Sequence, residues 1–209
     1  MSIYVFGPRD KKLVPDNAIV VNTTSSSKDF KGLSPFYLGP CKLYDDHVSQ
    51  TMENAWQYAK TYKSFVDSDG EIKDAYWNWA QKGWDNPRAE RYPMGKGAKP
   101  LFSYWKGDRL SYIQARMQIY FPLYKKAVRE TEAFERLFEL AERDDVWLFD
   151  FDGFLTDKSF IDVLLDPSRP MGHAFVLKAM LDYGERVTLR GLFEQANRKL
   201  ELAKVWERQ

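Results

Sequence analysis

Apolar residues recur at helical spacing along much of the chain, and short apolar runs lie between these stretches. The clearest helix is predicted over residues 50–66, where apolar side chains return every three or four positions after a capping residue at Ser49. The same spacing predicts helices over 74–84, from about Lys106 with a kink or end at Pro122, over 132–142 behind the cap Thr131, over 170–183 up to Gly184, and from Leu189 through Ala196 and Leu200 to Ala203.

Strands are fewer and shorter than helices. Residues 18–21 (AIVV) and 146–151 (VWLFDF) are the best strand candidates, and 36–38 and 42–44 are predicted as edge strands around Gly39-Pro40. The fold class expected is therefore α+β, mostly α with a few short strands. We expect an N-terminal extension over 1–17, one compact catalytic domain over 18–187, and a C-terminal helix over 188–209 that packs on the domain or extends from it.

Composition narrows the class of protein without naming a function. Of 209 residues, 44% are hydrophobic and 29% charged, which is ordinary for a globular domain, and the net charge of +1 gives no overall attraction to nucleic acid or membrane. The single cysteine, Cys41, and the absence of a signal-peptide pattern favour the cytoplasm. No apolar run is long enough to span a membrane, and a composition of two histidines and one cysteine argues against a zinc site.

The run VWLFDFDGFLTD carries two aspartates, Asp150 and Asp152, directly after an apolar strand. It resembles the first motif of haloacid-dehalogenase phosphatases, which implies a nucleophilic Asp150, an acid–base Asp152 and Mg²⁺. That fold needs further strand–helix units after the motif, and the residues after Asp157 read as helices. Two other interpretations stay open: the aspartates end a central strand, or they face a pocket in a different enzyme.

The polar side of the first predicted helix is a second candidate site. Glu53, Gln57 and Lys60 lie four and three positions apart, which places a carboxylate, an amide and an amine on one stripe beside Trp56. A solvated helix face is the alternative.

From Leu33 to Lys60 the sequence resembles the NADAR family of NAD- and ADP-ribose-associated proteins. The resemblance rests on Leu33-Ser34-Pro35-Phe36 and on a helix with Glu53, Gln57 and Lys60 in register, where Asn54 replaces the family's His. Trp105, Arg109 and Phe121 match the spacing of a later helix, and Asp152-Gly153 matches a late acidic element in which Phe151 replaces Trp. The matched region runs from about residue 18 to residue 183.

The resemblance implies an N-glycosidase that cleaves the N-ribosidic bond of an ADP-ribosyl or phosphoribosyl conjugate, without a cofactor or a metal. The implied substrate is a small molecule, a modified nucleobase or a nucleic acid that carries ADP-ribose, and no membrane is involved. Glu53 would stabilise the oxocarbenium-like sugar, Lys60 would be a catalytic amine that can form a Schiff base, and Asp152 would be a second acid–base group.

The predicted ligand contacts come from several segments. Asn22, Thr23 and Ser25 offer donors after a strand; Phe36, Tyr37 and Trp105 offer rings for stacking; Arg91, Lys96 and Lys99 offer charge to phosphate; Gln57, Arg109 and Gly153 follow from the matched motifs. Each of these rings could instead be part of the hydrophobic core. The basic loop could instead be an exposed loop that binds nothing. An ADP-ribose or NAD-binding module without turnover, and a nucleic-acid accessory protein, remain as other functions.

Overall fold

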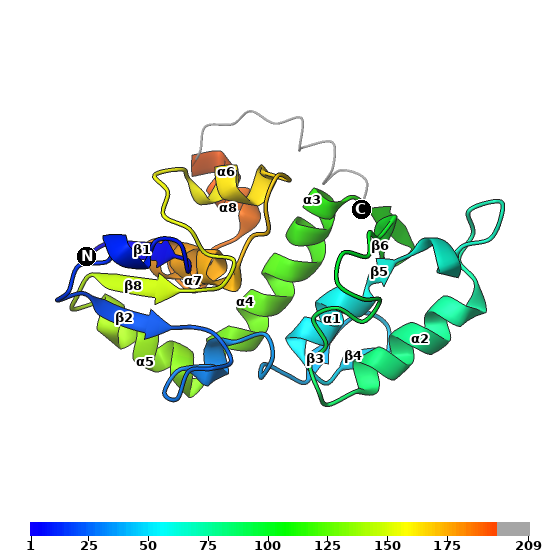
Figure 1. Ribbon diagram of the computed structural model, residues 1–209, viewed down its shortest axis with the longest axis horizontal. Helices are drawn as coiled ribbons and strands as arrows, with labels where there is room; N and C mark the ends of the chain where they lie inside the picture. The colour runs from blue at the N-terminus through cyan, green and yellow to red at the C-terminus, as the bar shows by residue number, and fades with distance from the viewer. Residues whose placement is uncertain (196–209) are drawn as a thin grey trace.

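The computed structural model describes residues 1–195, and it confirms the α+β class (Figure 1). A three-stranded parallel sheet lies in one half, in the order β1 (Ile3–Phe6), β8 (Val146–Phe149), β2 (Ile19–Asn22). The first residues therefore form an edge strand, not an extension before the domain. Because the sheet alternates inward and outward side chains, Val5, Val21 and Leu148 fall together on the buried face.

Helices cover one face of this sheet. These are α5 (Glu132–Ala141) and α7 (His173–Tyr183), and Figure 1 shows both behind the strands. Thr131 caps α5 by accepting a hydrogen bond from the amide of Phe134, and Gly184 ends α7 with φ of 89°, as the sequence predicts. The short helix α6 (Phe160–Leu165) precedes α7, and α8 (Leu189–Gln195) follows it. Ala196, Leu200 and Ala203 lie outside the described residues.

A long helical segment crosses the middle of the molecule. It begins as α3 (Tyr112–Ala115) behind a capping box of Ser111 and Gln114, widens to a π-helical turn over Arg116–Tyr120, and continues as α4 (Phe121–Arg129). The predicted start near Lys106 is wrong, because the helix begins at Tyr112, and the helix does not end at Pro122. The π turn directly before Pro122 absorbs its missing N–H, so the helix continues.

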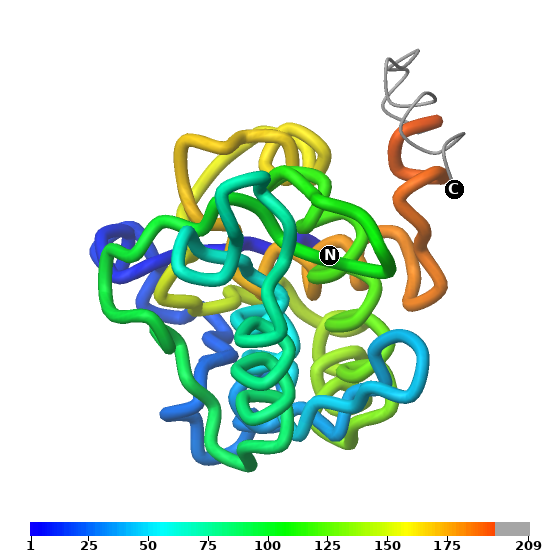
Figure 2. The backbone as a smooth tube through the Cα atoms, turned by 90° about the vertical axis from the view of Figure 1, so that its right-hand side faces the viewer, coloured from blue at the N-terminus to red at the C-terminus, as the bar shows by residue number. Residues whose placement is uncertain are grey.

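The second half contains α1 (Met52–Tyr58) and α2 (Asp74–Asp85), which pack side by side (Figure 2). It also contains the short pair β3 (Cys41–Lys42) and β4 (Val48–Ser49), and a sheet of β5 (Lys60–Thr61), β6 (Phe102–Trp105) and β7 (Asp108–Leu110). The segment 36–38 expected as a strand is not one; the other expected edge strand is β3. The predicted helix over 74–84 is α2.

The helix predicted over 50–66 ends at Tyr58, and its cap is Thr51, not Ser49. Lys60 leaves the helix because the next residues pair with β6, with Lys60 opposite Ser103. All residues of α1 are buried, so its polar side chains face the protein interior. None of the helices in residues 1–195 is long and apolar enough to cross a membrane.

Candidate active site

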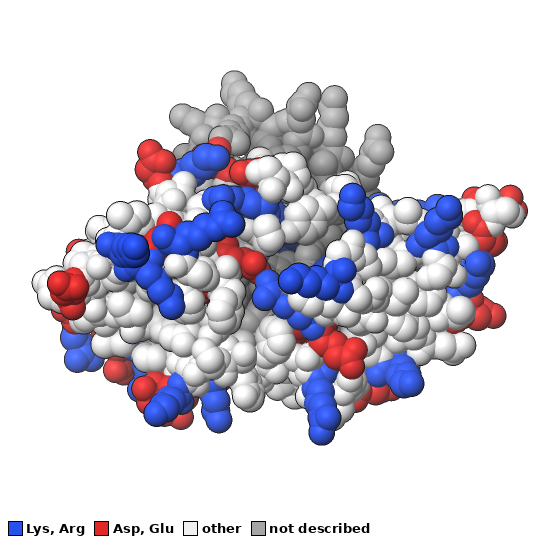
Figure 3. All heavy atoms as spheres, in the orientation of Figure 1, with Lys and Arg blue, Asp and Glu red and all other residues white. Residues whose placement is uncertain are grey.

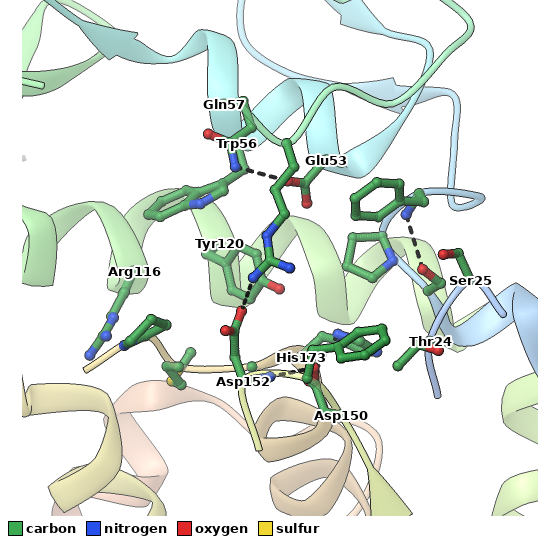
Figure 4. A pocket seen from close by; sticks show the side chains of 18 of the residues that line it. Thr24, Ser25, Glu53, Trp56, Gln57, Arg116, Tyr120, Asp150, Asp152 and His173 are labelled. Carbon is green, nitrogen blue, oxygen red and sulfur yellow. Dashed lines mark hydrogen bonds and ion pairs between the residues drawn. The ribbon is translucent and has the colours of Figure 1, made fainter. Parts of the chain in front are cut away.

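A cleft of about 310 Å³ lies where the two halves meet the long central helix. Figure 3 shows Lys and Arg side chains around a hollow in this face of the molecule, with acidic atoms inside it. The cleft draws its walls from α1, the loop after β2, the central helix, the loop after β8 and the start of α7 (Figure 4). Residues far apart in sequence therefore share one site.

Buried charge gathers in this cleft. Among Asp, Glu, Lys, Arg and His side chains of the described residues, only Glu53, Arg116, Asp150 and His173 are buried, and all four line the cleft. Removing a charged group from water costs on the order of several kcal/mol unless hydrogen bonds or an opposite charge compensate it. A fold that concentrates this cost in one cleft has the signature of a functional site.

Glu53, Gln57 and Lys60 form a hydrogen-bonded chain inside the cleft. The Gln57 Nε2 group donates to Glu53 Oε1 at 2.8 Å, and Lys60 Nζ donates to Gln57 Oε1 at 2.7 Å. The Lys60 ammonium also lies 4.9 Å from the centre of the Trp56 ring. The predicted polar stripe is thus enclosed, although Lys60 reaches it from β5 and not from a helix.

Burial pushes both ends of this chain toward their neutral forms. It raises the pKa of the Glu53 carboxyl, an effect that the Gln57 hydrogen bond and the Lys60 charge oppose. It lowers the pKa of the Lys60 amine to about 8, although the Glu53 charge acts in the other direction. Near neutral pH a fraction of Lys60 is therefore a free amine, which is the form that attacks an electrophile.

Arg91 and Asp152 form an ion pair across the cleft, with 2.7 Å between Nη2 and Oδ2 (Figure 4). Arg91 comes from the loop after α2, and Asp152 comes from the loop after β8. Burial raises the pKa of the Asp152 carboxyl, although Arg91 opposes the shift. Asp152 can therefore hold a proton at higher pH than an exposed aspartate.

Asp150 and His173 form a buried pair beneath Asp152. The Nδ1 atom of His173 lies 3.0 Å from Asp150 Oδ2, and Nε2 lies 2.9 Å from the carbonyl oxygen of Thr23. Both ring nitrogens face acceptors, so the arrangement is satisfied when the ring carries both protons. The amide of Ala174 donates to Oδ2 and the amide of Asp152 to Oδ1. His173 thereby connects the loop after β2, the end of β8 and the start of α7, and it also lines the cleft.

The surroundings of Asp150 give little support to the phosphatase interpretation. Both of its oxygens already accept hydrogen bonds from the protein, and the side chain is buried against His173. Across residues 1–195 no group of three or more His, Cys, Asp or Glu side chains is placed to hold a metal ion. Asp150 therefore behaves as a structural anchor at the end of the central strand.

Seven of the predicted residues line the cleft: Glu53, Lys60, Asp152, Phe36, Gln57, Arg91 and Ser25. Four others point elsewhere. Tyr37 is 57% exposed, and Lys96 lies on an exposed loop. Trp105 packs 4.7 Å from the Tyr44 ring because it belongs to β6, and Arg109 pairs with Glu71 at 3.0 Å on the surface.

Three further predicted contacts are structural. The Asn22 side chain accepts from the amide of Thr24 and shapes the turn after β2, and Thr23 Oγ1 donates to the carbonyl of Phe149. Gly153 packs against β1 so closely that a Cβ atom would lie 2.5 Å from the Phe6 carbonyl oxygen. The neighbouring Thr24 and Ser25 line the cleft in their place, and Ser25 was among the predicted donors.

The sequence interpretation did not assign several lining residues. They are Thr24, Tyr112, Arg116, Tyr120, Met171 and Gly172. Arg116 had a visible signal, because it falls between Ile113 and Tyr120 on the apolar stripe of its predicted helix, where an unpaired charge is costly. Tyr112 and Tyr120 had none, since an aromatic residue at helical spacing is ordinary core.

Comparison with known proteins gives one match. The model of a protein family described as "Family of unknown function (DUF6939)" matches residues 9–177, a span that contains every residue of the cleft. No curated protein and no solved structure matches the chain.

Proposed function

The chain belongs to DUF6939, a family of unknown function, and we propose that this member is an N-glycosidase that hydrolyses the N-ribosidic bond of an ADP-ribosyl or phosphoribosyl conjugate of a base. One observation carries the proposal: a buried carboxylate and an amine with a lowered pKa are linked through Gln57 in an enclosed cleft. The resemblance to NADAR proteins at Glu53, Gln57 and Lys60 supports the same reaction.

The chemistry of an N-ribosidic bond fits these groups. The bond breaks through a state with positive charge on C1 and the ring oxygen, which a carboxylate such as Glu53 stabilises. The free amine of Lys60 forms a bond to C1, the C1–N bond breaks, and its electron pair leaves with the base. Asp152 supplies the proton to the departing nitrogen, and water then hydrolyses the Lys60 adduct to release the ribosyl group. The raised pKa of Asp152 suits the role of acid.

Release of the base tests the proposal directly. Wild-type protein incubated with nucleobase-linked and amine-linked ADP-ribosyl and 5-phosphoribosyl compounds should release the free base and the free sugar. Lys60→Ala should lower this release at least about 100-fold, because it removes the nucleophile. Lys63→Ala is the matched control, since Lys63 is exposed and outside the cleft. Equal release by Lys60→Ala and wild type would exclude the mechanism, and tight binding with no release would point to a binding module.

The pH dependence of kcat/KM in an Asp152→Asn variant, which lacks the proposed acid, should report the free amine of Lys60. Because the pKa of Lys60 is about 8 in the folded protein, kcat/KM should rise about tenfold per pH unit below that value and level off above it. Single-turnover rates from pH 6 to pH 9.5 measure this limb. A rate that instead falls as pH rises through 8 would require the ammonium form and would rule out Lys60 as the nucleophile.

A further inference from the structure

Arg116 is the most deeply buried charged side chain of the described residues, with 1% of its surface exposed. Its guanidinium donates to the end of α6 and the segment after it: Nη1 to the carbonyls of Val163, Leu164 and Asp166, and Nη2 to the carbonyl of Arg169 and to the Tyr112 hydroxyl. The carbonyls at a helix C-terminus carry partial negative charge, so Arg116 caps α6 and holds this segment against the central helix.

The partners of Arg116 are all neutral groups. The other basic side chains of the cleft each have a carboxylate: Arg91 has Asp152, His173 has Asp150, and Lys60 reaches Glu53 through Gln57. No carboxylate in the described part of the chain lies within ion-pair distance of Arg116. Among the described residues, the positive charge of Arg116 therefore has no carboxylate beside it, although it is buried.

One donor of Arg116 also has no acceptor. The Nε–H group is buried and makes no hydrogen bond, although the residue lines the cleft (Figure 4). The Tyr112 ring lies over the guanidinium at 4.2 Å and its hydroxyl accepts from Nη2 at 2.9 Å, yet Tyr112 itself is 42% exposed. An exposed side chain that turns away would open the Nε and Nη2 groups to a ligand.

We propose that Arg116 is the anchor of an anion subsite that takes a phosphate group of the ligand. One phosphate oxygen replaces the Tyr112 hydroxyl on Nη2 and a second accepts from Nε–H, which gives the paired geometry that guanidinium and phosphate share. The bound dianion supplies the missing negative charge. The subsite adjoins Trp56, whose ring lies 6.3 Å from that of Tyr112, and thus adjoins Lys60. That the phosphate belongs to a ribosyl group rests on the proposed function; the phosphate subsite itself does not.

This placement replaces the phosphate donors expected from the sequence in the loop after α2. Lys96 and Lys99 are exposed on that loop and do not line the cleft. Arg91 does, but its Nη2 group is paired with Asp152, so its charge is already compensated. Phosphate recognition then lies at Arg116, whose burial strengthens a charge-assisted hydrogen bond.

Calorimetric binding of ribose 5-phosphate and ribose tests the subsite without any turnover. Wild type should bind ribose 5-phosphate at least about 10-fold more tightly than ribose, as one charge-assisted pair contributes about that much. Arg116→Gln should remove this preference, and Arg116→Lys should reduce it. The matched control Arg109→Gln, at an exposed arginine outside the cleft, should keep it. A wild type without preference, or an Arg116→Gln that keeps it, overturns the subsite.

Tyr112→Phe covers the case in which the Arg116 variants do not fold, because Tyr112 is partly exposed and its loss removes only a hydroxyl. This variant should bind ribose 5-phosphate at least as tightly as wild type, since the phosphate no longer has to displace the Tyr112 hydroxyl from Nη2. Its affinity for ribose should be unchanged. Weaker phosphate binding by Tyr112→Phe overturns the subsite. Phosphate preference together with no base release from any substrate would refute the glycosidase and leave the subsite intact.

Discussion

Glu53→Gln should lower kcat about 1,000-fold while KM changes little, the size of effect expected when a group acts on charge that develops in the transition state. The glutamine keeps an oxygen for the hydrogen bond from Gln57, so the side-chain arrangement survives. What disappears is the negative charge beside the reacting sugar. Initial rates at saturating and at limiting substrate separate kcat from KM. The matched control is Glu71→Gln, because Glu71 is exposed and pairs with Arg109 outside the cleft.

The same substitution should stabilise the protein at neutral pH by about 1 kcal/mol, as active-site substitutions that relieve a buried charge often do. Burial raises the pKa of Glu53 in the folded state above its ordinary value of 4.5, so the folded state holds the proton more tightly than the unfolded state. The contribution of Glu53 to stability is complete below pH 4.5 and is lost as pH rises through the folded pKa. The stability difference should therefore be largest at neutral pH and vanish in acid.

Chemical unfolding at pH 4 and pH 7.5 measures this difference. A Glu53→Gln variant that is inactive and less stable than wild type at pH 7.5 would mean that the carboxylate holds the fold together, and the case for a catalytic charge would fail. Full activity with unchanged stability would place Glu53 outside the chemistry altogether.

The local sequence pattern correctly predicts those strands and helix ends that neighbouring residues determine. The β-branched and aromatic runs of β2 and β8 form strands, and the caps of α5 and α7 lie where the sequence puts them. The end of α1 was not predictable in this way. The end of α1 is set by the pairing of Lys60 with Ser103, more than 40 residues later. No residue near Tyr58 signals a helix end.

The hairpin that carries Trp105 and Arg109 shows a different failure. Helical spacing from Leu110 onward was extended backward over a segment that turns at Lys106-Gly107, where φ is 52° and 92°. A glycine beside a residue in the left-handed region is a hairpin signal, and it outweighs spacing. The family resemblance likewise placed Trp105 and Arg109 on this helix and in the predicted site, whereas the structure puts them in a sheet.

Within the cleft, the spacing of Glu53, Gln57 and Lys60 was enough to predict that they share one side. The partners that shape the site come from other segments, and sequence spacing does not report which segments meet. Asp150 and His173 are 23 residues apart, and their contact depends on α7 packing behind the sheet. Arg116 meets its partners through the C-terminal end of α6, which lies about 50 positions later in the chain.

Asp150→Ala should destabilise the folded state by about 3–5 kcal/mol, the range expected when one partner of a buried ion pair is removed. The substitution leaves His173 charged or unsatisfied and leaves the amides of Asp152 and Ala174 without an acceptor. Asp150→Asn keeps an acceptor oxygen and should cost less. Asp182→Ala is the surface control, since its pair with Lys178 is partly exposed and should contribute at most about 1 kcal/mol.

A double-mutant cycle with His173→Gln distinguishes a structural role of Asp150 from a catalytic one. If the pair holds the cleft walls together, the losses in unfolding free energy from Asp150→Ala and His173→Gln should be far from additive, because each removes the same contact. Asp150→Asn should then lower the base-release rate only indirectly, through any displacement of the cleft walls. An Asp150→Asn variant with wild-type stability, no base release and lost phosphate release would instead make Asp150 a nucleophile. Independent losses at the two positions would mean that the pair does not hold the loop after β2, the end of β8 and the start of α7 together.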